Sequence, residues 1–163
     1  MNAWQPDVLG DGFEQRTIDL GADDEGPLVA TLVRALPRHR SVGARFFLRP
    51  LPLENVDVLY VHGWSDYFFQ RRLARFCTAR GASLFPLALR QHGRRLSPNQ
   101  PAGYVEPLAA YDAEIDASLQ LMRDRPVGQR RILLIGPPTR GLSLSPWRAP
   151  NPPSPPAPVL TRP

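Results

Sequence analysis

The sequence predicts an α/β fold, and three features indicate it. Short apolar runs rich in β-branched residues alternate with longer segments whose apolar residues recur every three or four positions. The first two runs are separated only by a polar, glycine-bounded turn, which predicts an N-terminal β-hairpin. The later order of strand, helix, strand, helix, strand is typical of a mostly parallel sheet with crossover helices. The chain has 163 residues, which is enough for one domain with a hydrophobic core.

The strands are expected at five places along the chain. Residues 13–20 and 28–34 form the hairpin, and residues 55–61 form the next strand, which ends at His62. Two further strands are expected over residues 82–89 and 129–135.

Two helices connect these strands. The first covers residues 67–80, and Gly81 ends it, because glycine accepts the left-handed backbone of a helix C-terminus. The second covers residues 105–123, and a loop over residues 91–103 precedes it. The apolar positions expected to face the sheet are Phe68, Leu73, Phe76 and Cys77 on the first helix, and Leu108, Tyr111, Ile115, Leu119 and Met122 on the second.

The composition changes after Gly136. Half of the 20 prolines in the chain follow this residue. Proline lacks a backbone donor and disrupts helices and central strands. We therefore expect one domain over residues 1–149 and a disordered, proline-rich tail over residues 150–163.

Composition also narrows the function classes. All 20 Lys and Arg residues are arginine, the net charge is +5, and the arginines are scattered in ones and twos, so no nucleic-acid partner is expected. The single cysteine, Cys77, excludes an internal disulfide and a multi-cysteine metal site, and its apolar surroundings predict a buried thiol. The N-terminus does not resemble a signal peptide, and no run approaches the roughly 20 apolar residues of a membrane span, so we expect a cytoplasmic protein.

Two strand ends could carry chemistry. The strand over residues 55–61 opens into His62-Gly63-Trp64, and a glycine at such a turn lets a backbone N–H approach a substrate oxygen. After a further strand and the two helices, the strand over residues 129–135 opens into a turn at residues 136–141. An α/β-hydrolase carries its nucleophile elbow, Gly-x-Ser-x-Gly, at such a turn. Here the serine position holds Pro138, and the second glycine position holds Arg140.

With these motifs the chain resembles bacterial α/β-hydrolases of the serine aminopeptidase (S33) or monoacylglycerol-lipase-like group, also described as lysophospholipase-like. The resemblance covers roughly residues 10–149, about the first half of such a domain. The matching segments are His62-Gly63-Trp64-Ser65-Asp66-Tyr67-Phe68, Leu89-Arg90-Gln91-His92-Gly93-Arg94, Tyr104-Val105, Tyr111-Asp112-Ala113-Glu114-Ile115-Asp116 and Leu133-Leu134-Ile135-Gly136.

The resemblance implies an incomplete α/β-hydrolase fold and a serine hydrolase of carboxylic esters or small acyl substrates, with no metal and no cofactor. The oxyanion donors would be the N–H groups of Trp64 and Thr139, with His62 and Gly63 shaping the turn. Pro138 occupies the nucleophile position, and its ring holds φ at a negative value, which does not allow the strained elbow backbone. The family's catalytic Asp and His follow later strands, and the chain ends before them. We therefore expect a truncated, inactive hydrolase.

Two other interpretations stay open. One is a non-catalytic binding or interaction fragment, and the other is a frame-damaged reading of a longer gene. In the family the strand over residues 129–135 lies centrally, beside strands that this chain lacks. Its edge would then be unpaired, which predicts self-association.

For the remaining polar residues a structural role is the simpler interpretation. Ser65 fits a helix cap better than a substitute nucleophile, and His92 with Arg90 and Arg94 fits a solvated loop better than an anion site. Ser143 and Ser145 lie outside any Gly-x-Ser-x-Gly pattern. Asp112, Glu114 and Asp116 resemble a carboxylate cluster, but Asp112 and Asp116 share one helix face, whereas Glu114 points elsewhere. A solvated face is the simpler interpretation, because a metal site would need histidine or further carboxylates nearby.

Overall fold

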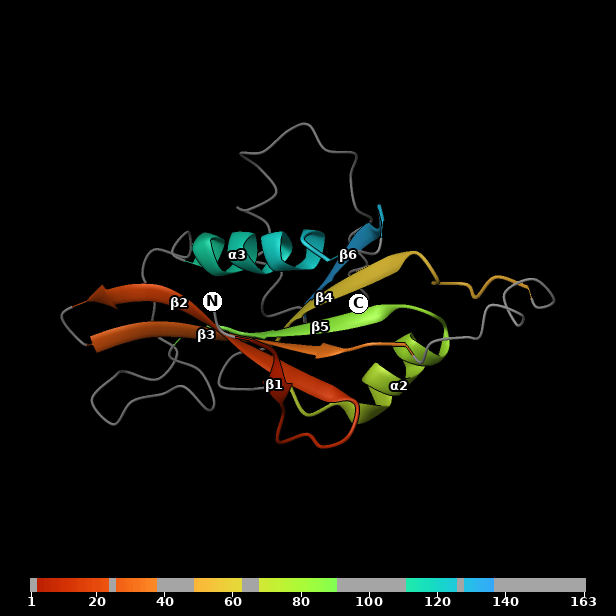
Figure 1. Ribbon diagram of the computed structural model, residues 1–163, viewed down its shortest axis with the longest axis horizontal. Coiled ribbons are helices and arrows are strands. Elements are labelled where there is room, and N and C mark those ends of the chain that lie inside the picture. The colour runs from red at the N-terminus through yellow and green to blue at the C-terminus, as the bar shows by residue number, and fades with distance from the viewer. Residues whose placement is uncertain are drawn as a thin grey trace.

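The computed structural model of the 163-residue chain describes residues 3–23, 26–37, 49–62, 68–90, 111–125 and 128–136. These residues form six strands in one sheet and two helices (Figure 1). The strands are β1 (Gln5–Pro6), β2 (Phe13–Asp23), β3 (Gly26–Ala35), β4 (Val56–Val61), β5 (Ser83–Ala88) and β6 (Arg131–Ile135), and the helices are α2 (Arg71–Ala79) and α3 (Asp112–Arg123).

The sheet has the strand order β1-β2-β3-β5-β4-β6. The expected hairpin is confirmed, because β2 pairs antiparallel with β3 from Phe13 opposite Ala35 to Asp23 opposite Gly26. β3 is antiparallel to β5, whereas β4 lies parallel to both β5 and β6. The predicted α/β class is therefore confirmed, but the sheet is mixed, and its parallel part consists of β5, β4 and β6.

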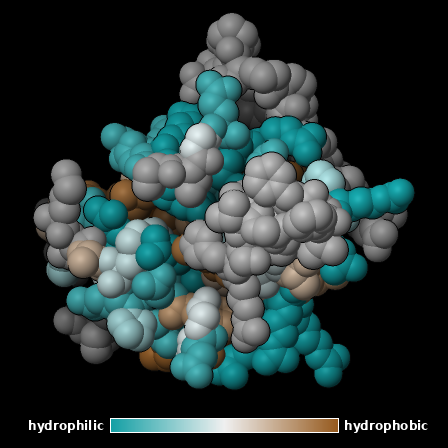
Figure 2. All heavy atoms as spheres, turned by 45° about the vertical axis from the view of Figure 1, so that its right-hand side comes forward, coloured by the Kyte–Doolittle hydropathy of each residue, from teal (hydrophilic) through white to brown (hydrophobic). Residues whose placement is uncertain are grey.

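The two helices cover opposite faces of the sheet, which gives three layers (Figure 1). On the α3 side, strand residues such as Leu32, Leu59 and Phe85 are packed against one face of the helix. The buried residues of this face are Ile115, Leu119 and Met122 of α3 and Tyr111 directly before it, as predicted. On the α2 side, Ala74 and Cys77 pack against residues of β3, β4 and β5. On the face seen in Figure 2, the described side chains are mostly hydrophilic, and the hydrophobic ones form small separate groups.

The predicted first helix is partly wrong. α2 begins at Arg71, and Phe68, although buried and edge-on to the ring of Tyr60, precedes the helix. Phe76 is 51% exposed rather than buried. Ala74 and Cys77 face the sheet, and Phe76 lies about 100° around the helix from Cys77, so its ring points outward under the guanidinium of Arg80 at 3.7 Å.

Gly81 ends α2 as predicted. Its φ is +91°, and a Cβ there would lie 2.8 Å from the Cα of Glu54, so only glycine fits without a shift of the backbone. Neither α2 nor α3, the helices that the structure describes, is long and apolar enough to cross a membrane. The expected loop over residues 91–103 and the tail over residues 150–163 lie outside the described residues.

Candidate functional site

The carboxyl ends of the three parallel strands lie at one edge of the sheet. Tyr60 of β4 is opposite Ile135 of β6, and Val61 of β4 is opposite Leu87 of β5. The residues that follow these strands, His62, Leu89 and Gly136, therefore leave the sheet at the same edge. In open α/β sheets, ligands bind at the carboxyl ends of the strands.

His62 is fully buried at this edge and has a defined hydrogen bond. Its Nε2 accepts the backbone N–H of Leu89 at 3.2 Å, across the boundary between β4 and β5. An imidazole nitrogen that accepts a hydrogen bond carries no proton, so we assign the Nδ1–H tautomer to His62. Because the Nε2 lone pair is engaged, this geometry favours a structural role for His62 over that of a general base.

Arg90, the residue after Leu89, is held by a carboxylate. Both the backbone N–H and the side-chain Nε–H of Arg90 donate to Oε1 of Glu114, at 3.0 and 2.7 Å. The Glu114 side chain is fully buried, and the Arg90 side chain is 13% exposed. Two consecutive amides beyond β5, those of Leu89 and Arg90, are thus bonded by side chains from the end of β4 and from α3.

Glu114 points away from the face of Asp112 and Asp116, as predicted, but it is buried rather than solvated. Asp116 is exposed and Asp112 is partly exposed, but Glu114 lies on the side of α3 that meets the sheet. Its partner, Arg90, is 24 residues away in sequence. The pair forms because a carboxylate in a low-dielectric interior needs an opposite charge and hydrogen bonds.

Glu114 has an unusual electrostatic environment. Burial raises the pKa of its carboxyl group, and the hydrogen bonds and charge of Arg90 counteract that rise. Its second oxygen, Oε2, is buried and has no hydrogen-bond partner in the part of the chain that the structure describes. Buried polar atoms are almost always paired, so among the described residues Oε2 has unusual spare hydrogen-bonding capacity.

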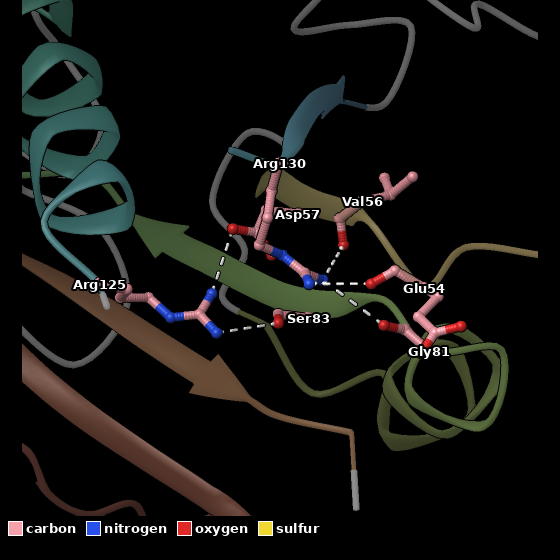
Figure 3. Close-up of polar contacts among 7 residues, drawn as sticks. All are labelled: Glu54, Val56, Asp57, Gly81, Ser83, Arg125 and Arg130. Atoms are coloured by element: carbon pink, nitrogen blue, oxygen red, sulfur yellow. Dashed lines mark hydrogen bonds and ion pairs between the residues drawn. The ribbon is translucent and has the colours of Figure 1, made fainter. Parts of the chain in front are cut away.

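A second polar cluster lies at the opposite, amino ends of the same strands (Figure 3). Asp57 of β4 is buried between two arginines: Arg125 Nη1 lies 3.1 Å from its Oδ2, and Arg130 Nε lies 2.6 Å from its Oδ1. Arg130 also donates to the backbone oxygens of Glu54 and Val56, at 2.8 and 2.9 Å. The cluster joins β4 to the segments that follow α3 and precede β6.

Sequence reasoning missed this cluster, although one signal was present. Asp57 interrupts an otherwise apolar strand, Val56-Asp57-Val58-Leu59, and a charged residue in a buried strand requires a partner. The pattern does not say which partner, because Arg125 and Arg130 are 68 and 73 residues away.

Many of the predicted site residues lie outside the described residues: Gly63, Trp64, Ser65, His92, Arg94, Pro138, Thr139, Ser143 and Ser145. Cys77 is buried as predicted, and burial raises the pKa of its thiol, so the reactive thiolate is disfavoured. Within the described ranges, no three His, Cys, Asp or Glu side chains are grouped so as to hold a metal ion.

Comparisons with known proteins give distant structural neighbours. No family model and no curated protein matches the sequence. Among solved structures, the chain is similar to the fluorophosphonate-binding serine hydrolase FphF of Staphylococcus aureus, with 13% identity and a TM-score of 0.44 over 78% of this chain and 48% of that one.

Two further solved structures are also similar. They are the S-formylglutathione hydrolase FrmB of Staphylococcus aureus, with 14% identity and a TM-score of 0.39 over 76% of this chain and 47% of that one, and brefeldin A esterase, a bacterial homologue of human hormone-sensitive lipase, with 17% identity and a TM-score of 0.37 over 88% of this chain and 36% of that one. The chain therefore spans about half or less of the length of these three proteins.

Proposed function

We propose that this chain is a member of the α/β-hydrolase lineage, of the S33 or monoacylglycerol-lipase-like group, that no longer hydrolyses esters. The observation that carries the proposal is the parallel register of β4 and β6, with Tyr60 opposite Ile135. This register brings together the ends of the two strands that carry the hydrolase-like motifs, His62-Gly63-Trp64 and the turn that begins at Gly136. The two strand ends lie far apart in sequence, so their position at one sheet edge does not follow from either motif alone.

The proposed inactivity rests on the residue at the nucleophile position. Pro138 has no hydroxyl, and its ring holds φ at a negative value, whereas the elbow of a serine hydrolase needs a strained, positive φ. The oxyanion donors in this proposal are the N–H groups of Trp64 and Thr139. They would stabilise a negative oxygen only after a nucleophile had attacked, and no serine occupies that place.

His62 supports the same interpretation. Its Nε2 is already bonded to the amide of Leu89, so it holds two strand ends together rather than accepting a proton from a nucleophile. In this proposal residues 1–149 form the hydrolase-like domain, residues 150–163 form a proline-rich tail, and the protein is cytoplasmic. The substrate class of the lineage is a small ester or acyl compound, with no metal or cofactor.

The test is covalent labelling of the purified full chain with a fluorophosphonate probe, with p-nitrophenyl acetate hydrolysis measured in parallel. We expect no probe adduct by intact mass and no hydrolysis above buffer, whereas an active serine hydrolase labelled under the same conditions gives one adduct per chain. Ser65→Ala serves as the matched variant, because Ser65 is the serine nearest the His62 turn in sequence. An adduct on any serine that disappears when that serine is replaced would overturn the inactive assignment.

A further inference from the structure

The two edges of the sheet differ in their capacity to pair. At one edge, β1 consists of two residues, Gln5 and Pro6, and proline lacks an N–H. At the other edge, β6 consists of five residues, Arg131–Ile135, four of which are leucine or isoleucine. Natural sheets protect their edges with short strands and proline, and the β1 edge has both. Within the described residues, β6 pairs with one strand, β4.

The hydrogen bonds of β6 show which of its backbone groups face outward. The N–H of Arg131 donates to the carbonyl oxygen of Asn55 at 2.9 Å, so the backbone of Arg131 points toward β4. The backbone N–H and C=O groups of successive strand residues point to opposite sides of the strand, so those of Leu133 and Ile135 also point toward β4. The N–H and C=O groups of Ile132 and Leu134 therefore point toward the outer edge.

We propose that the outer edge of β6 pairs with the β6 of a second copy of this chain, in antiparallel orientation and centred on Leu133. In this register Ile132 lies opposite the partner's Leu134, and Leu134 lies opposite the partner's Ile132. Each of these opposing pairs exchanges two N–H···O=C bonds, so four backbone hydrogen bonds join the copies. The proposal rests on the sheet and does not depend on whether the chain is a hydrolase.

The side-chain faces agree with this pairing. Ile132 packs against the core cluster on the α3 side, whereas Leu133 and Ile135 pack against the cluster on the α2 side. In antiparallel pairing, opposite residues lie on the same face of the joined sheet. The side chains of Ile132 and the partner's Leu134 therefore lie on the α3 side of the joined sheet and continue one apolar layer across the junction.

This register keeps the like charges of the two copies apart. Arg131 is exposed at the start of β6, and centring on Leu133 places it opposite the partner's Ile135. The two Arg131 side chains then lie at opposite ends of the junction, so two like charges do not face each other. This is also the register in which all five residues of β6 find a partner residue.

The test is a charge-reversal pair at Ile135, measured by sedimentation velocity on the full chain over a range of concentrations. Ile135→Arg places a second positive charge opposite the partner's Arg131, whereas Ile135→Glu places a negative charge there. Two such pairs form in each dimer, so we expect the dissociation constant to rise by about 2- to 30-fold for Ile135→Arg relative to Ile135→Glu. Both variants lose the same apolar side chain, so a purely structural role of Ile135 would affect them equally.

Two controls complete the test. Gln5, exposed on the opposite edge strand β1, is changed to Arg and to Glu, and these variants are expected to have equal dissociation constants despite the same change in net charge. The double variant Arg131→Glu with Ile135→Arg restores opposite charges across the junction and is expected to recover the affinity of Ile135→Glu. A wild-type chain that stays monomeric at concentrations up to about 100 μM, or equal dissociation constants for Ile135→Arg and Ile135→Glu, would overturn the proposal.

Discussion

Buried carboxylate–arginine pairs lie at both the amino and the carboxyl ends of the parallel strands, but the two ends differ in how many carboxylate oxygens have a partner among the described residues. At the amino ends, both oxygens of Asp57 have arginine partners, and Arg130 also bonds two backbone oxygens. At the carboxyl ends, Oε1 of Glu114 accepts two bonds from Arg90, while Oε2 has no partner among the described residues. The amino end is closed by its own contacts, whereas the carboxyl end, where α/β sheets bind ligands, keeps polar capacity.

The charge balance of the two ends also differs. The amino end has two arginines for one buried carboxylate, and burial lowers the pKa of Arg125 while the charge of Asp57 raises it. The carboxyl end pairs one arginine with one carboxylate. We therefore expect that removing the carboxylate is more damaging at the amino end, where two partly buried cations lose their counterion.

The largest expected effect follows from Asp57→Ala. Removing one member of a buried ionic cluster costs about 3–5 kcal/mol of unfolding free energy, because the remaining charges stay desolvated without a partner. Urea unfolding monitored by circular dichroism measures this loss. Asp57→Asn keeps the size and one acceptor oxygen and is expected to cost less than Asp57→Ala. A loss below about 1 kcal/mol for Asp57→Ala would show that the cluster is a solvated surface pair.

A smaller effect is expected from Glu114→Ala. It leaves the amide of Arg90 without its acceptor, which costs about 1–3 kcal/mol of unfolding free energy. Glu114→Gln is the matched variant, because it keeps an acceptor oxygen and the shape of the side chain. The same urea unfolding assay at pH 7 measures the loss of unfolding free energy in both variants.

The pH dependence of the Glu114 effect has a defined sign. Burial raises the pKa of this carboxyl in the folded state above its ordinary value of 4.5. The folded state then binds more protons than the unfolded state between these two values, so this group's contribution to stability falls as pH rises through that window. The wild type is therefore expected to lose stability relative to Glu114→Gln as the pH increases upward from 4.5. A difference that stays constant with pH, or that grows in favour of the wild type, would contradict the raised pKa.

Local patterns predicted much of the fold. The hairpin, the buried face of α3 and the glycine that ends α2 all depend on residues within a few positions of one another. The exposure of Phe76 was not predicted, because the helix begins at Arg71 and its orientation is set by Ala74 and Cys77 against the sheet. The extent of the parallel part of the sheet depends on strand order, which no local pattern encodes.

The sites were harder to predict than the fold. The pairing of Glu114 with Arg90 and of Asp57 with Arg125 joins residues 24 and 68 positions apart. Asp57 interrupts an apolar strand and so signals a buried charge, but the partner of either carboxylate follows only once the strands are placed. His62 was predicted from the motif that ends β4, but its bond to Leu89 depends on the parallel register of β4 and β5.

The central claim is that His62 holds the ends of β4 and β5 together and does not act as a base. Long-range ¹H–¹⁵N correlation spectra at pH 7 report which imidazole nitrogen carries the proton, and amide hydrogen exchange reports whether the Leu89 N–H is bonded. The account predicts the Nδ1–H tautomer and a protected Leu89 amide, with that protection lost selectively in His62→Ala. An Nε2–H tautomer, or a Leu89 amide that exchanges as fast as an unstructured one, would contradict it.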